Sequence, residues 1–323
     1  MSNDLFAYIR EDLNILEESL RAAMDTSLPL IADVGMHMVN SGGKRLRPAL
    51  CLLSARAGQS FNREHVMPLA VAIEMVHMAS LMHDDVIDEA DTRRGAPAVN
   101  SQWGNQIAIL AGDHMFAQAF QVVYEEHYGE EVALRMAKLI SGLSSGEIIQ
   151  DASVFKGNCG VADYLNRIEL KTADFLAVSC ELGAMVSGVD EATVKALRTY
   201  GHDLGMAFQI TDDLLDVVEK TETIGKPAGN DIRQGIVTLP VIRAIETSTD
   251  GNELEAIVTN PDMTDSLLKR ALEIVRTSDG EAFCRQMAAD YIANAKASVK
   301  GSVPDTLYSE LVKIADFIGQ RSF

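Results

Sequence analysis

Apolar residues recur at spacings of three and four positions along most of the chain, which is the period of an α-helix and not of a β-strand. The first such stretch is marked by Leu13, Leu16 and Leu20. Further helices are predicted over residues 66–88, 106–126, 132–150, 162–188 and 192–218, and from 240 to about 318. No alternating run of useful length predicts a strand. The chain is therefore expected to be all-α.

The segment 66–88 is apolar on nearly every side, and the segments 106–126, 132–150, 162–188 and 192–218 repeat that character. Such helices belong in the interior of a bundle, because each of their faces needs a neighbour. The longest predicted loop is the polar, glycine-rich segment 220–238, and no low-complexity linker divides the chain. We therefore expect a single domain over residues 1–323, a bundle of long antiparallel helices around central buried ones.

Charge and composition narrow the range of functions. The 323 residues include 47 acids and 28 bases, a formal net charge of −19. Nucleic acid is not an expected partner, because binding its phosphates needs an electropositive face. The N-terminus MSNDLFAYIREDL lacks the apolar stretch of a signal peptide, and no long uncharged apolar run predicts an integral membrane segment. We expect a cytoplasmic protein whose four cysteines are reduced, buried thiols.

Three aspartates end the first apolar segment. Asp84 and Asp88 lie four positions apart and share a helix face, and Asp85 lies about a third of a turn away. Carboxylates crowded at the end of an apolar helix repel one another, and a hard cation such as Mg²⁺, which takes oxygen ligands, relieves that repulsion. Taken alone, this DDxxD cluster is equally well explained as a solvated helix end.

A second cluster, Asp212, Asp213 and Asp216, repeats the arrangement at the end of another apolar segment. Two copies in the same context are much harder to explain as solvated helix ends. If the two helix ends lie at matching depth, their carboxylates surround one cavity that suits several Mg²⁺ ions and a diphosphate.

Basic residues cluster at two places in the sequence that suit the binding of an anion. Lys44, Arg45 and Arg47 lie in GGKRLRP, where glycines allow close backbone approach and a helix is predicted to begin. Arg93 and Arg94 follow the first aspartates. Arginine makes paired contacts to phosphate oxygens, and lysine supplies a compact charge. The alternative is that Arg93 and Arg94 only neutralise the aspartate cluster.

Two histidines, His77 and His83, lie on the first acidic helix. His77 precedes Asp84 by two helical turns on the same face, so it could donate to a second phosphate, although a lone helical histidine is more often structural. No spacing of cysteine and histidine suggests zinc, and no GxSxG, GxGxxG or Walker A sequence is present.

Six motifs in this order resemble the trans-isoprenyl diphosphate synthase family, also called polyprenyl synthetases. They are GGKRLRP at 42–48, MHDDVIDEADTRRG at 82–95, GEIIQ at 146–150, KTADF at 171–175, FQITDDLLD at 208–216 and GKPAGNDIRQGIVTLP at 225–240. This chain departs from the family at Ile236, where the family often carries lysine after the glycine of the last motif.

The resemblance implies an all-helical homodimer with a deep apolar cavity. The reaction would join isopentenyl diphosphate head to tail to an allylic diphosphate, and about three Mg²⁺ ions would be bound with the diphosphate. Asp84, Asp85 and Asp88 would hold metal at the allylic diphosphate, and Asp212 and Asp216 would hold the remaining ion.

Other roles are implied in the same way. The residues that contact the allylic diphosphate or stabilise its developing charge would be Arg93, Lys171, Thr172, Gln209 and Lys226. The residues that bind the diphosphate of isopentenyl diphosphate would be Lys44, Arg47, His77 and Arg94. Metal and cations would stabilise the leaving diphosphate, and the isopentenyl double bond would attack the allylic cation in a dry site. The departing diphosphate would then accept the proton.

Product length is expected to depend on the helix before Asp84. In this family, bulky side chains four and five residues before the first aspartate cap short products, and here these positions are Ser80 and Ala79. Small residues imply an open tunnel and a product longer than geranylgeranyl; the alternative is a short-chain farnesyl or geranylgeranyl diphosphate synthase. A deeper floor, or simply ordinary core, is expected from Met75, Met78, Met115, Phe116 and Phe120.

Other classes of protein fit less well. A class I terpene cyclase has a DDxxD cluster but normally a different second metal motif, and it needs no GGKRLRP site. A head-to-head coupler of the squalene synthase type is disfavoured for the same reason. A non-catalytic subunit of a heteromeric synthase tends to lose its aspartate clusters, and this chain keeps both. A plain helical binding protein is the simplest remaining alternative.

Overall fold

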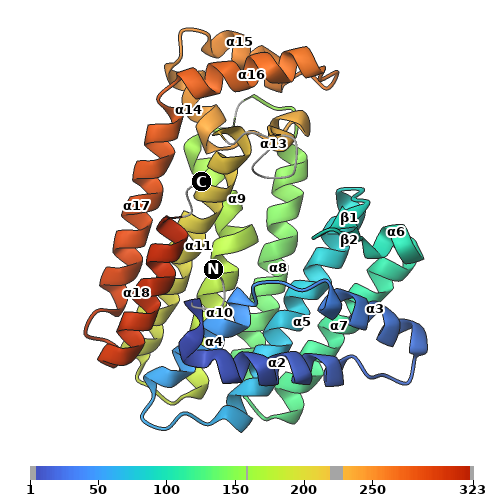
Figure 1. Cartoon of the computed structure of the whole chain (residues 1–323), viewed down its shortest axis with the longest axis vertical. Coiled ribbons are helices and arrows are strands. Elements are labelled where there is room, and N and C mark those ends of the chain that lie inside the picture. The colour runs from blue at the N-terminus through green and yellow to red at the C-terminus, as the bar shows by residue number, and fades with distance from the viewer. Residues whose placement is uncertain (1–4, 158, 219–227, 321–323) are drawn as a thin grey trace. The chain divides into compact units, whose positions relative to one another are not determined.

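The computed structural model describes residues 5–157, 159–218 and 228–320 (Figure 1). Within those ranges the regular elements are helices, apart from two antiparallel two-residue strands, Thr92–Arg93 (β1) and Ala96–Pro97 (β2). The all-α prediction is confirmed. The chain divides into two compact units by its own contacts, while the expectation of one functional domain stays a prediction.

The first unit comprises Met1–Ile140, Val178–Arg198 and Gly301–Glu310. Its helices in chain order are Ala7–Ile9 (η1), Arg10–Ala23 (α2), Pro29–Asn40 (α3), Leu46–Ser54 (α4), Ala55–Ala57 (η2), Arg63–Ile87 (α5), Val99–Trp103 (α6) and Asn105–Glu125 (α7), followed by the start of Glu130–Ser153 (α8).

Helix α5 is the core of the first unit. It packs along α7 and also against α4 and α2, and the side chain of Asn62 caps its start by accepting a bond from the backbone N–H of His65 at 3.3 Å. By length and composition α5 could cross a membrane, but 72% of its most apolar window is buried inside the structure. It therefore has the burial of a core helix.

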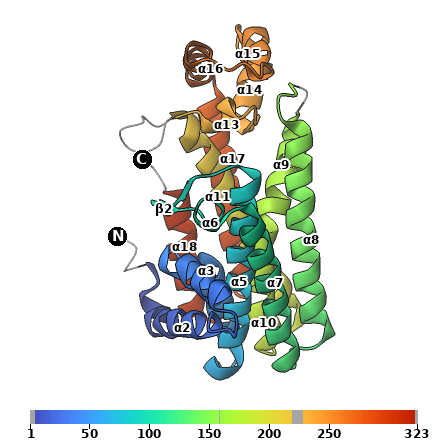
Figure 2. The ribbon, with the colours of Figure 1, turned by 90° about the vertical axis from the view of Figure 1, so that its right-hand side faces the viewer.

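Helices α5 and α7 run antiparallel within this unit (Figure 2). At one end the hydroxyl of Tyr128, just after α7, donates to the carbonyl of His65 at 2.5 Å. At the other end the ring of His83 bonds the carbonyl of Ile109 at 3.1 Å. A Cβ at Gly112 would lie 2.3 Å from that ring, so glycine there lets the ring approach α7 closely. The start of α7 thus lies beside the acidic end of α5.

The second unit comprises Ser141–Ala177, Thr199–Lys300 and Leu311–Phe323. Its elements beyond α8 are Val161–Ile168 (α9), the π-helical turn Glu169–Ala173 (η3), Asp174–Val186 (α10), Glu191–Val218 (α11), Asn230–Arg233 (α13), Leu239–Thr247 (α14), Gly251–Val258 (α15), Asp265–Thr277 (α16), Gly280–Val299 (α17) and Asp305–Gly319 (α18).

Close packing of α11 positions the π-helical turn η3. A Cβ at Gly205 on α11 would lie 2.5 Å from the Cα of Ala173, and a Cβ at Gly201 would lie 2.5 Å from the carbonyl oxygen of Leu176. The two glycines therefore let the backbones touch. This contact holds Lys171 and Thr172, which η3 carries, beside the helix that ends in the second aspartate cluster.

Candidate active site

The GGKRLRP turn has a backbone that only certain residues adopt easily. Gly42 and Gly43 have φ of 72° and 152°, and Arg45 has φ of 48° just before α4 begins. The guanidinium of Arg94 donates to the carbonyl of Gly42, and a Cβ at Gly43 would lie 2.6 Å from Nη1 of Arg94. Glycine at position 43 thus admits the Arg94 side chain, and the structure brings Arg94 to the turn that carries Lys44 and Arg47.

Arg47 and His77 meet on neighbouring helices. Nη1 of Arg47 lies 3.2 Å from Nε2 of His77. Because a guanidinium can only donate, Nε2 of His77 must accept. Burial, and next the charge of Arg47, lowers the pKa of His77 well below its usual range, so the ring is neutral. Two residues predicted for isopentenyl diphosphate are therefore adjacent, with the charge on the arginine.

The three aspartates at the end of α5 have different surroundings. Asp85 is buried and accepts a 2.6 Å bond from Nε of Arg93, and burial raises its pKa although Arg93 opposes the shift. Asp84 is half-buried and Asp88 is exposed. Asp85 therefore orients Arg93, while Asp84 and Asp88 lie nearer the surface on their shared helix face.

The second cluster is also divided. Asp213 is buried, and its two carboxylate oxygens accept bonds from the hydroxyl of Tyr164 at 2.8 Å and from Nε2 of Gln209 at 2.7 Å. Burial raises the pKa of Asp213 to about 6. Asp212 beside it is exposed. Asp213 is thus engaged inside the fold by Tyr164 and Gln209.

The same hydrogen-bond chain continues to η3. The hydroxyl of Thr172, which is 8% exposed, donates to Oε1 of Gln209 at 2.8 Å. Two predicted catalytic residues are therefore in contact, and Asp213 fixes the direction of the amide between them. Because the proton of Thr172 is used in this bond, its oxygen offers lone pairs to any other neighbour.

Asp216 binds the segment that follows α11. Its carboxylate accepts bonds from the backbone N–H groups of Asn230 and Asp231, each at 3.2 Å, and its carbonyl accepts from Gly229 at 2.8 Å. Burial, and then the charges of Asp213, Asp216 and Asp212, raises the pKa of Asp231 to about 8. Sequence reasoning missed this fourth carboxylate because it lies outside both DDxxD clusters, although it belongs to the quoted GKPAGNDIRQGIVTLP motif.

Lys171 is held by an acid from another matching motif. Its Nζ lies 2.5 Å from Oε2 of Glu147 on α8. Gly146 allows this approach, because a Cβ there would lie 2.7 Å from Cγ of Lys171. Lys226 lies outside the described residues.

The carboxylates suit a hard cation that is held largely by the substrate. Oδ2 of Asp85 is buried and accepts no hydrogen bond within the described residues, so an oxygen is available for a cation. No group of three His, Cys, Asp or Glu side chains in the described ranges is close enough to hold a metal by itself. Mg²⁺ normally completes its shell with phosphate oxygens and water, so this arrangement fits Mg²⁺ bound together with a diphosphate.

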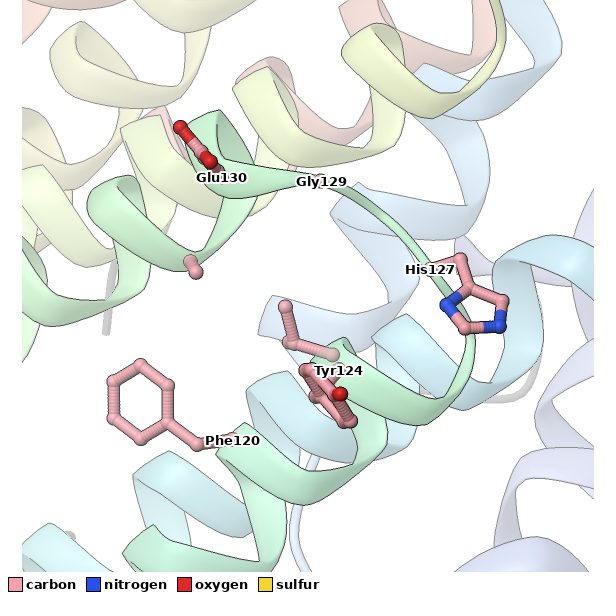
Figure 3. A pocket seen from close by; sticks show the side chains of 7 residues that line it. Phe120, Tyr124, His127, Gly129 and Glu130 are labelled. Atoms are coloured by element: carbon pink, nitrogen blue, oxygen red, sulfur yellow. The ribbon is translucent and has the colours of Figure 1, made fainter.

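A cavity of about 520 Å³ lies at the far end of the α5–α7 pair from Asp84 (Figure 3). Figure 3 shows Phe120 and Tyr124 on α7, His127 and Gly129 on the connection to α8, and Glu130 at the start of α8. The rise of an α-helix places Asp84 about 28 Å along α5 from the bond between His65 and Tyr128 that marks this end. The lining residues are Phe120, Val123, Tyr124, His127, Gly129, Glu130 and Ala133.

The residues predicted to control product length lie on α5 between these ends. Ala79 is fully buried, and the hydroxyl of Ser80 donates to the carbonyl of His77 at 2.9 Å. Met75, Met78 and Met115 are buried core residues. The first aspartate cluster belongs to one unit and the second to the other. That the two clusters face one cavity stays a prediction.

Comparison with known proteins agrees with these features. A family model described as polyprenyl synthetase matches residues 28–275. The chain is 36% identical over 319 residues to heptaprenyl diphosphate synthase component 2 of Bacillus subtilis, covering 98% of this chain and 90% of that one. It is 36% identical over 278 residues to nonaprenyl diphosphate synthase of Mycobacterium tuberculosis, covering 84% and 82%. The crystal structure of a polyprenyl synthase from Caulobacter crescentus, complexed with calcium and isoprenyl diphosphate, matches with a TM-score of 0.91 and 34% identity, covering 99% and 98%. This chain belongs to the polyprenyl synthetase family.

Proposed function

We propose that this prenyltransferase extends an allylic diphosphate with isopentenyl diphosphate, in a Mg²⁺-dependent reaction, to a trans-polyprenyl diphosphate longer than geranylgeranyl. The observation that carries the proposal is the group formed by Arg47, His77 and Arg94 at the GGKRLRP turn. A chain with a net charge of −19 collects cations and a neutral histidine there. Such a group suits a second diphosphate, which elongation needs and cyclisation does not.

The residues of the first unit bind isopentenyl diphosphate and Mg²⁺ in this proposal. Lys44, Arg47, His77 and Arg94 bind the diphosphate of isopentenyl diphosphate, and His77 does so as a neutral ring in contact with the Arg47 guanidinium. Asp84 and Asp88 hold Mg²⁺ at the allylic diphosphate, with Asp85 in support. When bound, Mg²⁺ neutralises charge on the leaving diphosphate.

Other residues act at the allylic group. Arg93, oriented by Asp85, and Lys171 contact the allylic diphosphate. Thr172, whose proton is committed to Gln209, turns oxygen lone pairs toward the cation that forms when the carbon–oxygen bond breaks. The isopentenyl double bond attacks that cation, and the departing diphosphate takes the proton. The roles of Asp212, Asp216 and Lys226 at the remaining metal and the diphosphate are carried over from the family motif.

Two features support a long product. Ala79 and Ser80 place no bulk beside the first aspartates, and the cavity between α7 and α8 lies about 28 Å further along α5. We propose that this cavity, lined in part by Phe120 and Val123, receives the distal end of the growing chain. The alternative, a short-chain synthase, would need a block on α5 above the cavity.

An exposed apolar face on α7 supports a homodimer. Ile109, Leu110 and Tyr124 are 43%, 51% and 81% exposed, and apolar side chains grouped on one exposed face are typical of a contact surface. We propose that a second copy covers this face in the cytoplasm, where both anionic substrates dissolve. The name "component 2" of the Bacillus subtilis relative points to a second component for that protein, so a heteromer is the alternative.

Product analysis tests the function directly. The purified chain is incubated with labelled isopentenyl diphosphate, farnesyl diphosphate and Mg²⁺, and the dephosphorylated products are sized by chromatography. Labelled linear alcohols longer than geranylgeraniol are expected, and chelation of Mg²⁺ should abolish them. A cyclic hydrocarbon would instead indicate a terpene cyclase, and the absence of turnover would indicate a binding protein or a subunit that needs a partner.

A further inference from the structure

Arg45 lies in the GGKRLRP turn but differs from its cationic neighbours. Lys44 is exposed, whereas Arg45 is only 6% exposed and points into the fold. Its φ of 48° is in the left-handed region, which a residue with a side chain adopts at a cost. Its carbonyl accepts the first bond of α4, from the N–H of Ala49 at 3.0 Å. Arg45 therefore sets the direction in which α4 leaves the turn.

The buried guanidinium joins three other helices to this turn. It donates to Glu17 on α2 at 2.6 Å, to Glu74 on α5 at 2.8 Å and to the carbonyl of Val39 on α3 at 3.0 Å. The side chain of Glu74 is 3% exposed, so its bond to Arg45 is shielded from water. A charge-assisted bond in such surroundings is both strong and directional. One side chain thus fixes the start of α4 against α5.

The two partners lie next to the proposed diphosphate residues in the chain. Glu74 precedes His77 by one helical turn on α5, and Arg47 follows Arg45 by two residues on α4. The contact between Arg47 and His77 at 3.2 Å therefore depends on how α4 is held against α5, which is what Arg45 and Glu74 determine. Burial lowers the pKa of Arg47 to about 10, and the charge of Glu74 opposes that fall.

We propose that Arg45 and Glu74 are positioning residues for the isopentenyl diphosphate site. Their ion pair sets the spacing between Arg47 and His77 before the substrate arrives, and neither residue touches the substrate. The proposal rests on the proposed function, because it assigns Arg47 and His77 to that diphosphate. If the ion pair only stabilised the fold, its loss would not change the KM for isopentenyl diphosphate more than the KM for the allylic substrate.

The test replaces the pair with apolar side chains of similar size, Arg45→Met with Glu74→Leu, because exchanging both partners avoids leaving one buried charge unpaired. The KM for isopentenyl diphosphate should rise about tenfold or more, since a small misplacement of binding groups is costly. The KM for farnesyl diphosphate and kcat should change by less than about twofold, because the allylic residues lie elsewhere. The single variant Glu74→Gln should give a smaller change in the same direction.

Glu181→Gln is the matched control. Glu181 is also a buried carboxylate with two arginine partners, Arg135 at 3.0 Å and Arg198 at 2.6 Å, but it lies on α10, and neither arginine is a proposed site residue. This variant should unfold at a lower temperature than the wild type and keep the wild-type KM for both substrates. Equal rises in both KM values of the double variant, or an unchanged KM for isopentenyl diphosphate, would overturn the proposal.

Calorimetric titration with isopentenyl diphosphate, without allylic substrate, gives a readout that does not depend on turnover. The wild type should bind about tenfold more tightly than the double variant. A wild type that binds but never elongates would overturn the proposed function and leave this inference standing. If the wild type elongates but the double variant binds isopentenyl diphosphate equally tightly, the proposed function stands and this inference is overturned.

Discussion

Nζ of Lys171 lies 2.5 Å from Oε2 of Glu147, so a lysine predicted to hold the allylic diphosphate is bound to an acid in the free chain. The side chains are 27% and 16% exposed, so water screens the pair only in part. A diphosphate that recruits Lys171 must therefore compete with Glu147, and it must also approach the negative charge of that acid.

Replacing Glu147 with Gln should tighten the binding of the allylic substrate. The neutral amide keeps the size of the side chain but removes the competing charge, so the Kd for farnesyl diphosphate should fall roughly threefold to fivefold. Glu131→Gln on the same helix is the control, since Glu131 pairs with Arg135 on the surface and should leave the Kd unchanged. A weaker affinity in Glu147→Gln would show that the acid orients the lysine instead of competing for it.

Thr172→Val tests the proposed lone pair beside the allylic cation. Valine keeps the shape of the side chain but removes the oxygen that is directed by Gln209. We expect kcat to fall by about 10- to 100-fold while both KM values stay within about twofold, because the loss is felt only when charge develops. Thr211→Val is the control, since its buried hydroxyl bonds only the carbonyl of Ala207 within α11 among the described contacts. A change confined to KM would place Thr172 in ground-state binding.

The raised pKa of Asp231 predicts how stability depends on pH. Burial and the neighbouring acids raise that pKa to about 8 in the folded chain, against about 3.9 in an unfolded one. The folded state therefore holds a proton that the unfolded state has lost. The resulting stabilisation is fully present below about pH 4 and is lost as the pH rises through about 8.

Thermal unfolding of the ligand-free chain should accordingly occur at lower temperature at pH 8.5 than at pH 5. Asp231→Asn, which keeps the backbone N–H bonded to Asp216 but cannot ionise, should flatten this dependence. Asp265→Asn at an exposed position of α16 should keep the wild-type slope. If Asp231→Asn retains the full slope, another group must carry the proton.

The periodicity of apolar residues predicted the helices well where one face or all faces are buried. The expected segments 66–88, 106–126 and 192–218 correspond to α5, α7 and α11 within a few residues. The periodicity did not locate helix boundaries where the apolar spacing continues from one helix into the next. The expected helix 162–188 is divided by η3, because a π-helical turn adds one residue without interrupting the apolar pattern. The tail from 240 to about 318 is five helices, α14 to α18.

The site could be predicted only as far as its motifs are local in sequence. The DDxxD spacing and GGKRLRP indicated metal and diphosphate, and the nearness of Arg93 to the first cluster indicated an ion pair there, but no spacing indicated which aspartate Arg93 pairs with or that Asp213 is buried and bonded to Gln209. Those differences depend on partners such as Tyr164, which lies 49 positions from Asp213. No spacing rule identifies such a partner, because only the packing of distant helices decides it.

The apolar face of α7 predicts a change in assembly. Leu110→Asp adds a charge beside Ile109 on the exposed apolar face of α7, so a dimer that buries this face should dissociate. Sedimentation velocity should then show a monomer, while the wild type and Asn14→Asp, which adds the same charge at an exposed position of α2, remain dimeric. A wild type that sediments as a monomer would favour the heteromeric alternative.

Filling the cavity between α7 and α8 should shorten the product. Ala133 lines that cavity near Phe120, and Ala133→Phe places a ring where the distal end of the chain is proposed to lie. Ala79→Tyr, much closer to Asp84 on α5, should shorten the product further, because it blocks the path nearer its start. Sizing of labelled products should therefore give the order wild type, Ala133→Phe, Ala79→Tyr from longest to shortest.

Ala137→Phe separates this effect from a general loss of activity. Ala137 is exposed one turn further along α8 and does not line the cavity, so the same ring there should leave the product distribution unchanged. If Ala133→Phe gives the wild-type length while Ala79→Tyr shortens it, the growing chain leaves α5 before it reaches the cavity. If both give the wild-type length, the chain does not follow α5 at all.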